Sequence, residues 1–218
     1  KKHTLKFLKK AISLATVSEF SKKDIATVYK IDADKIDVVY SAAKEIFCPA
    51  SDDAKAATKS KYTGGKEYFV YAGAIHPRKN LMNLLKAFSV FKKRMQSNMK
   101  LVLAGRQAWK YESFAESLKS YKYRYDVVLT GYVSEDELVK IIGSAYGLVY
   151  PSLLEGFGVP VLEAMQCNVP VITSAGTSMQ EIAGEAALYA KPDDLTDIAD
   201  KMMLLYKDEK LRNELIGK

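Results

Sequence analysis

Residues 148–165 read LVYPSLLEGFGVPVLEAM, and this stretch decides the fold class. It opens with an apolar run, 148–150, that predicts a short strand. A loop with two glycines follows, and a helix begins near Pro160, because the fixed φ of proline suits the first turn. Glu155 lies in the loop, and Glu163 lies eight positions later, about one turn into the helix. A strand, a glycine-rich loop and a helix in this order form the repeating unit of an α/β fold.

The same alternation of apolar runs and helical stretches continues on both sides of this stretch. Further strands are predicted at 68–72, 101–104, 127–129, 171–173 and 187–189. Helices are predicted from Leu81 through Phe91, over 110–122, from a capping box of Ser134 and Glu137, and at the C-terminal end. Continuous apolar strands between helices predict a parallel sheet covered on both faces, a doubly wound, Rossmann-like α/β domain. Its ligand is expected at the carboxyl ends of the strands.

The region before this pattern is organised differently. Residues 1–49 predict two short strands, at 14–17 and 36–40, and two helices, which cannot enclose a core by themselves. We interpret 1–49 as the C-terminal remnant of a preceding domain. Residues 50–66 are small and polar with a Gly-Gly pair, which predicts a linker. Residues 67–218 then form the ligand-binding domain.

Composition excludes several classes of protein. The chain of 218 residues is 48% hydrophobic and has no run that approaches the roughly 18 apolar residues of a membrane-spanning helix, and we expect no signal peptide. Cys48 and Cys167 lie far apart without a CxxC partner, so neither a disulfide framework nor a zinc site is expected, and free thiols fit a reducing cytoplasm. The two histidines are too few for a histidine metal cluster.

The net charge of +7 permits two interpretations. It is compatible with nucleic-acid binding, but the lysines are spread along the chain and mixed with acids, which favours solvated helix faces. We therefore expect no nucleic-acid partner. A diphosphate ligand or an acidic membrane surface would be attracted by the same charge.

Three predicted strands end in loops that could meet a phosphate ligand. Gly73 follows the first strand directly and would allow a ligand close to the backbone, and the cations Arg78 and Lys79 follow beside a helix start. The next two strands end at Ala104-Gly105-Arg106 and Thr130-Gly131-Tyr132-Val133. Each loop taken alone is equally compatible with a plain turn and solvated side chains.

The loop of 155–158 is the most informative of the strand ends. Gly156 and Gly158 leave backbone N–H groups uncovered just before a helix start, which makes an anion-binding nest. A carboxylate at Glu155 or Glu163 can accept hydrogen bonds from neighbouring hydroxyls of a ribose or a hexose. Two chance charges or a glycosidase acid/base pair are the alternatives. A dinucleotide oxidoreductase is disfavoured, because Gly73 opens no GxGxxG pattern.

These motifs together resemble glycosyltransferase family 4. Residues 155–165 fit the family's E-x7-E motif throughout, and 73–80 resemble its G-x-L-x-P-R-K-N stretch. Residues 134–138 and 170–174 also fit, and 15–22 resemble the end of the family's N-terminal domain. The resemblance implies a two-domain GT-B fold, of which this chain carries the C-terminal donor-binding domain and the tail of the first domain.

The resemblance also implies an activity and site residues. The activity is transfer of a sugar, with retention of configuration, from a nucleotide diphosphate sugar such as GDP-mannose or a UDP-sugar to a hydroxyl acceptor. Glu155 would bind the donor sugar, Glu163 the ribose hydroxyls, and Lys79 with Arg78 the diphosphate. The remaining donor-binding positions would be Gly73, Arg106, Tyr132, Val133, Gly156, Phe157, Gly158 and Val159. Ala74 stands where many members have arginine, so Arg78 and Lys79 would carry more of the charge.

Further expectations follow from the family. An acceptor-binding domain would precede residue 1 and supply a histidine that neither His3 nor His76 replaces, and the family's last helix would continue beyond Lys218. A glycan or lipid-linked acceptor would bind that domain, in polysaccharide or glycoconjugate synthesis in the cytoplasm, at the inner face of a membrane. No metal or other cofactor is expected, because cations and a helix dipole would stabilise the leaving diphosphate. The alternative is a module that binds a nucleotide without turnover.

Overall fold

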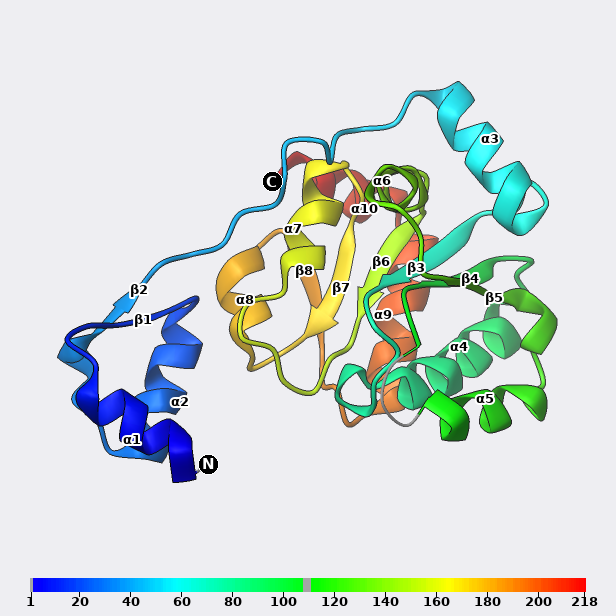
Figure 1. The fold of residues 1–218 in the computed structure, drawn as a ribbon. Coiled ribbons are helices and arrows are strands. Elements are labelled where there is room, and N and C mark those ends of the chain that lie inside the picture. Colours follow the sequence, from blue (N-terminus) through cyan, green and yellow to red (C-terminus); the bar gives the residue numbers. More distant parts are fainter. Residues whose placement is uncertain (1, 108–110) are drawn as a thin grey trace.

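The computed structural model describes residues 2–107 and 111–218 (Figure 1). Its helices are α1 (Lys2–Lys10), α2 (Glu19–Tyr29), α3 (Asp52–Thr63), α4 (Leu81–Met95), α5 (Tyr111–Lys119), α6 (Glu135–Gly143), α7 (Val159–Gln166), α8 (Ser178–Ala183), α9 (Leu195–Lys207) and α10 (Glu209–Gly217). Its strands are β1 (Leu14–Thr16), β2 (Ile36–Val38), β3 (Tyr68–Ala72), β4 (Lys100–Ala104), β5 (Val127–Gly131), β6 (Gly147–Tyr150), β7 (Val171–Ser174) and β8 (Ala187–Ala190).

Six of the strands form one parallel sheet in the order β5-β4-β3-β6-β7-β8. The order reverses between β3 and β6, so this is the doubly wound arrangement and the predicted α/β class is confirmed. Helix α4 packs against α9 and α6 packs against α7, and Figure 1 shows α4 and α6 on opposite sides of the sheet. The carboxyl ends of all six strands meet at one edge.

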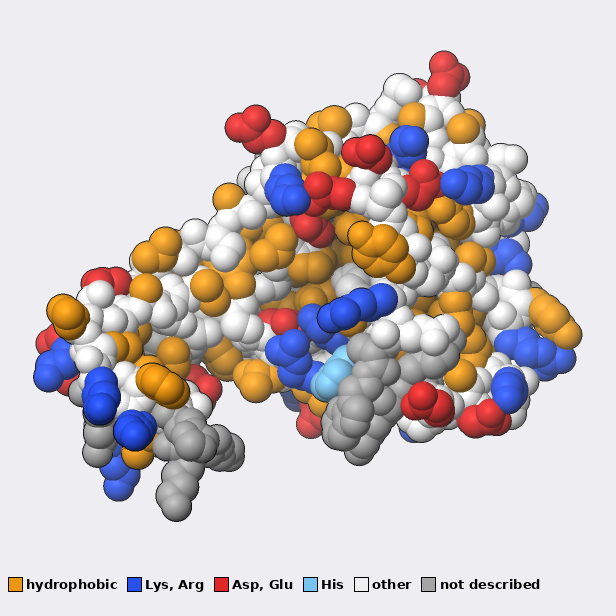
Figure 2. Space-filling model, in the orientation of Figure 1, with side chains coloured by type: hydrophobic (Ala, Val, Ile, Leu, Met, Phe, Trp, Pro, Cys, Tyr) orange, Lys and Arg blue, Asp and Glu red, His pale blue; other side chains and the backbone are white. Residues whose placement is uncertain are grey.

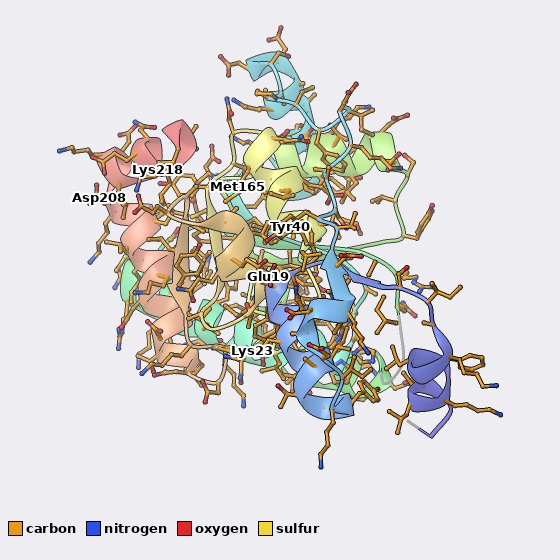
Figure 3. The ribbon with its side chains drawn as sticks, turned by 90° about the vertical axis from the view of Figure 1, so that its left-hand side faces the viewer. Glu19, Lys23, Tyr40, Met165, Asp208 and Lys218 are labelled. Carbon is orange, nitrogen blue, oxygen red and sulfur yellow. The ribbon has the colours of Figure 1, made fainter. Side chains whose placement is uncertain are left out.

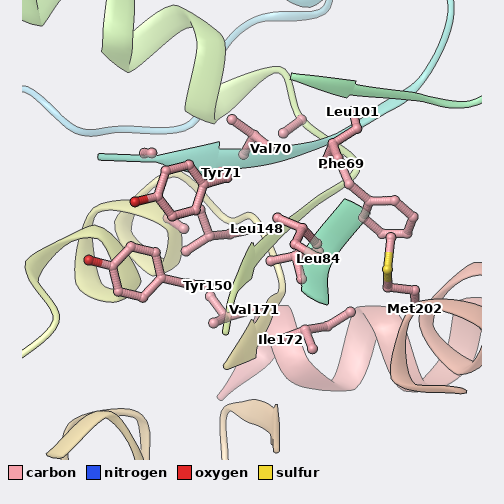
Figure 4. Close-up of a cluster of buried hydrophobic side chains, with 14 of the residues drawn as sticks. Phe69, Val70, Tyr71, Leu84, Leu101, Leu148, Tyr150, Val171, Ile172 and Met202 are labelled. Carbon is pink, nitrogen blue, oxygen red and sulfur yellow. The ribbon is translucent and has the colours of Figure 1, made fainter. Parts of the chain in front are cut away.

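The core explains why these runs become strands. All five residues of β3 are fully or almost fully buried, because helices cover both faces of the sheet and leave no strand face for water. Figure 4 shows Phe69 beside Met202 of α9, and Leu84 of α4 near Leu148 of the sheet. The aromatic side chains of Tyr71 and Tyr150 lie at the end of this cluster and connect the core to the ligand edge.

The interpretation of 50–66 as a linker is wrong in part. Residues 52–63 form helix α3, whose N-terminus is capped by the hydroxyl of Ser51 and whose C-terminus is closed by Gly64 in the left-handed conformation. This helix packs against α6, and its Lys61 lies 2.5 Å from the carboxylate of Glu137. The composition is that of a linker, but the end signals are those of a helix.

The remaining differences are small. The predicted helix over 110–122 is observed as Tyr111–Lys119, and residue 110 lies outside the described residues. Helix α8 has no counterpart among the predicted elements, because six residues are too few to show a repeating helical pattern of apolar positions. Strands β1 and β2 pair in parallel in a separate two-stranded sheet, and α2 lies between them in the chain.

Candidate functional site

The loops after β3 and β6 meet where the strand order of the sheet reverses. The backbone N–H of Leu153 donates to the carbonyl of Arg78 at 2.9 Å. The backbone of Asn80 adopts the left-handed conformation, which asparagine tolerates. Its buried side-chain amide donates to the carbonyl of Pro151 at 3.0 Å. Ligands of doubly wound sheets bind in the crevice at this position.

The predicted cations and the first glutamate form a cluster in this crevice. Lys79 Nζ lies 2.6 Å from Glu155 Oε1, and Arg78 lies 3.5 Å from Glu155 Oε2. The carboxylate of Glu155 is largely buried, with its side chain 9% exposed, whereas that of Arg78 is 47% exposed. Burial of a carboxylate is costly without a partner, so Lys79 compensates most of this charge. The structure therefore brings together Arg78, Lys79 and Glu155 as the sequence predicts.

Tyr150 also belongs to this cluster, although the sequence predicts it only as a strand residue. Its hydroxyl accepts a hydrogen bond from Lys79 Nζ at 2.5 Å, and its ring stacks on Tyr71 with 5.6 Å between ring centres. Burial raises the pKa of Tyr150 well above its usual range, and the Glu155 charge adds to the effect. The phenol therefore stays neutral and fixes the direction of the lysine.

The glycine loop after Glu155 is bound by Ser178 of α8 and presents N–H groups without a partner among the described residues. The buried hydroxyl of Ser178 donates to the carbonyl of Glu155 at 2.8 Å and lies 3.3 Å from that of Phe157. Within the described part of the chain, the N–H groups of Gly156, Phe157 and Gly158 donate no hydrogen bond. They are therefore available to a ligand at the start of α7, where the sequence predicts an anion-binding nest.

Gly158 is required by this geometry. It is the N-cap residue of α7 with a φ of 105°, a conformation that other residues rarely adopt. A Cβ added at Gly158 would also lie 2.7 Å from Met179 Cγ. Val159 then begins α7 and is half-buried.

Glu163 differs from Glu155 in having no partner. It lies one turn into α7 and is partly buried, and no described residue hydrogen-bonds its carboxylate or pairs with it. Burial raises the pKa of Glu163 to about 7, the nearby charge of Glu135 at the start of α6 adds to this rise, and Lys44 opposes it. A partly buried carboxyl group without a partner is an acceptor available to hydroxyl groups of a ligand.

The loops after β4 and β5 line the other end of the same edge. Gly105 packs its backbone so closely on β3 that an added Cβ would meet the carbonyl oxygen of Gly73 at 1.9 Å. The N–H of Gly105 donates to the carbonyl of Gly131 at 3.1 Å, which links the second and third loops. Arg106 and Tyr132 are exposed, the latter at 82%, and Val133 is half-buried. In the described part of the chain, none of these three residues hydrogen-bonds to or pairs with Arg78, Lys79 or Glu155.

The surface around these loops is hollowed and basic on one side. Figure 2 shows Lys and Arg side chains gathered beside hydrophobic ones in the hollow between the N-terminal part and the main domain. Among the residues described, no group of three metal-ligating side chains occurs. Of the helices in 2–107 and 111–218, none has the length and apolarity that crossing a bilayer requires.

The chain matches known proteins along most of its length. The family described as glycosyl transferases group 1 matches residues 52–218. The O-antigen chain mannosyltransferase B of Escherichia coli is 32% identical over 91% of this chain and 52% of that protein. The O-antigen chain mannosyltransferase RfbU of Salmonella typhimurium is 33% identical over 86% of this chain and 49% of that protein. The chain thus spans about half the length of these relatives.

Solved structures agree on the fold. HepE of Anabaena, in a crystal structure with UDP and glucose, superposes with a TM-score of 0.87 over 99% of this chain and 59% of that protein, at 15% identity. The family match includes α3 and every loop of the candidate site. The chain belongs to the glycosyl transferases group 1 family.

Proposed function

We propose that this chain binds a nucleoside diphosphate sugar and forms the donor-binding part of a retaining mannosyltransferase in polysaccharide synthesis. One observation carries the proposal. At the reversal of the strand order, the Lys79–Glu155 pair lies beside a loop with three unpaired N–H groups, and the same loop leads into the helix that carries the unpaired Glu163.

Each part of this arrangement matches one part of the donor. The N–H groups of 156–158 and the cations Lys79 and Arg78 suit the diphosphate, because charge-assisted hydrogen bonds favour it over a neutral group. Glu155 retains acceptor sites for sugar hydroxyls beside its ion pair. Glu163 would accept the two ribose hydroxyls. Arg106, Tyr132 and Val133 would line the base pocket, with Gly73 allowing close approach of the ligand.

The relatives supply the proposed sugar and pathway. Two of them are O-antigen mannosyltransferases at 32% and 33% identity, which supports mannose as the transferred sugar and a polysaccharide as the product. We propose GDP-mannose as the donor. A glycan or lipid-linked acceptor would bind a part of the protein outside these residues, in the cytoplasm at the inner face of the membrane.

The proposed reaction needs no redox partner. The bond between the anomeric carbon and the β-phosphate oxygen breaks, and the acceptor oxygen forms a bond to that carbon on the same face. The acceptor proton passes to the leaving diphosphate. Lys79, Arg78 and the N–H groups of the nest would stabilise the charge that develops on that diphosphate, so we propose that no metal is required.

Binding can be tested on the chain itself. Thermal unfolding would be followed with GDP-mannose, UDP-glucose and ADP-glucose, since a ligand at one hundred times its Kd stabilises by about 2.7 kcal/mol. We expect the largest shift with GDP-mannose. A larger shift with another nucleotide sugar would replace the donor, and no shift with any would refute the donor site.

Turnover separates an enzyme from a binding module. We expect the 218-residue chain to bind the donor without glycosylating an acceptor, because the relatives are about twice as long and catalysis requires both substrates to be held in place. The full-length protein should transfer mannose with retention, as read from the anomeric coupling in the NMR spectrum of the product. Binding without transfer by the full-length protein would favour the non-catalytic module.

A further inference from the structure

The loop of residues 155–158, here called the donor loop, is bound by the first turn of α2. This helix precedes the domain of residues 67–218 by more than thirty residues. The hydroxyl of Ser18, which is fully buried, donates to the carbonyl of Gly156 at 2.6 Å. The hydroxyl of Ser21 donates to the same carbonyl at 3.0 Å. Two hydroxyl donors on one loop carbonyl, with Ser18 and Gly156 separated by 138 positions in the sequence, form a specific long-range contact.

Glu181 of α8 holds that first turn in place. Its carboxylate accepts from the N–H of Glu19 at 2.8 Å and from the N–H of Phe20 at 2.9 Å. The hydroxyl of Tyr40 adds a third hydrogen bond at 2.9 Å. Figure 3 shows Glu19 and Tyr40 beside α8. A carboxylate at a helix N-terminus satisfies free N–H groups and interacts favourably with the helix dipole.

The charge of Glu181 is part of this contact. Burial by itself would raise the pKa of Glu181, but the N–H groups of Glu19 and Phe20 and the Tyr40 hydroxyl outweigh it and hold that pKa below its usual range. Glu181 is thus ionised at neutral pH.

The two helices fix successive peptide units of the loop. Ser178 of α8 binds the carbonyls of Glu155 and Phe157, whereas Ser18 and Ser21 bind the carbonyl between them. A peptide unit is planar, with its carbonyl and the following N–H pointing in opposite directions. A fixed Gly156 carbonyl therefore fixes the direction of the Phe157 N–H, the central donor of the nest.

We propose that Ser18, Ser21 and Glu181 are positioning residues for the donor's diphosphate and sugar. Glu181 anchors α2, the two serine hydroxyls hold the Gly156 carbonyl, and the Phe157 N–H is thereby aimed at the ligand. Since α2 lies in the part of the chain before residue 50, that part completes the donor site rather than only adjoining it. This inference rests on the proposed function for the identity of the ligand.

Ser21→Ala is the most selective variant, because it removes one hydrogen bond to the Gly156 carbonyl. It leaves intact the capping hydrogen bond that Ser18 Oγ accepts from the N–H of Ser21. Titration calorimetry should show about three-fold weaker binding of GDP-mannose and less than two-fold change for GMP. Ser21→Thr, which keeps a hydroxyl, should restore the affinity. Thr27→Ala is the matched control, since that hydroxyl donates to the carbonyl of Lys23 within α2.

Glu181→Ala should have the larger effect, about ten-fold on GDP-mannose, because it releases the whole first turn of α2. Glu185→Ala is its control, since that exposed carboxylate pairs with Lys218. Equal losses for GDP-mannose and GMP in the Ser21 and Glu181 variants would overturn the inference.

A second measurement does not depend on the ligand. In the ¹⁵N-¹H spectrum of the free chain, Ser21→Ala should shift the amide resonance of Phe157, and Thr27→Ala should not. An unchanged Phe157 resonance would overturn the inference whatever the chain binds. A shifted resonance in a chain that binds no nucleotide would instead refute the proposed function and leave the mechanical link between α2 and the loop supported.

Discussion

The loop of 150–158 and the helix α7 that follows it carry the same residue type in opposite surroundings. In the loop, Glu155 is 8% exposed and lies 2.6 Å from Lys79. In the helix, Glu163 is partly buried and has no partner among the described residues, and burial raises its pKa to about 7. The charge of Glu155 is compensated within the protein. The carboxylate of Glu163 is instead a free acceptor, to which the hydroxyl groups of a ligand would donate.

Lys79→Ala should have the largest effect, because it removes the nearest cation from the buried Glu155 and leaves Arg78 at 3.5 Å. We expect a loss of about 2–4 kcal/mol in the free energy of unfolding, measured by urea denaturation. Binding of GDP should weaken about 10- to 100-fold, with little change for guanosine. Lys86→Ala on the exposed face of α4 is the control. Equal losses for both ligands would mean that Lys79 only shapes the loop.

Glu163→Ala should weaken binding of the bare nucleoside diphosphate by about 1–3 kcal/mol, if the carboxylate accepts the ribose hydroxyls. In contrast with Lys79→Ala, it should not lower the stability of the free chain, because it breaks no ion pair. Calorimetry with GDP and with 2′,3′-dideoxy-GDP tests the contact. A wild-type chain that binds both equally would remove this role from Glu163.

The raised pKa of Glu163 predicts a pH dependence of opposite sign for stability and for binding. Between pH 4.5, the usual pKa of a glutamate, and about pH 7, Glu163 keeps a proton in the folded chain that it has lost in the unfolded chain. Glu163 therefore makes the free energy of unfolding fall as the pH rises through that window. Affinity for GDP should rise up to about ten-fold from pH 6 to pH 8, as the carboxylate ionises. The terminal phosphate titrates nearby, so Glu163→Gln measured in parallel is the control. An identical pH profile in that variant would contradict the assignment.

Tyr150→Phe should have the smallest effect of the four. It removes the hydroxyl that accepts from Lys79 Nζ and keeps the ring stacked on Tyr71. We expect a loss of about 1 kcal/mol in diphosphate binding and a similar loss in stability. No change in either quantity would show that Glu155 alone directs the lysine.

Much of the fold could be predicted from local sequence, because buried parallel strands have continuous apolar runs that need no partner to be recognised. The predicted cap at Ser134 is also present, since its hydroxyl accepts from the N–H of Glu137. The other half of that capping box is not, because the Glu137 carboxylate pairs with Lys61 and accepts from Tyr62. Those partners belong to α3, a helix that the composition concealed.

The candidate site could be predicted only in part, for a similar reason. Lys79 and Glu155 were placed together because strands of a parallel sheet end at one edge, which is a rule of the fold. Ser178 and Glu181 were not predicted, since their roles depend on a six-residue helix and on where α2 docks. No local pattern in 18–21 or 178–181 encodes that docking. The assigned contacts of the site residues with a donor remain predictions.

The docking of α2 has a consequence for how the protein is made. Helix α2 leaves the ribosome before Glu181, its anchor, which follows Glu19 by 162 residues. At roughly 5–20 residues per second, the first turn of α2 waits about 10–30 s for its partner. Until Glu181 emerges, water can satisfy the N–H groups of this first turn, and the donor loop reaches its final shape only as the last quarter of this chain emerges.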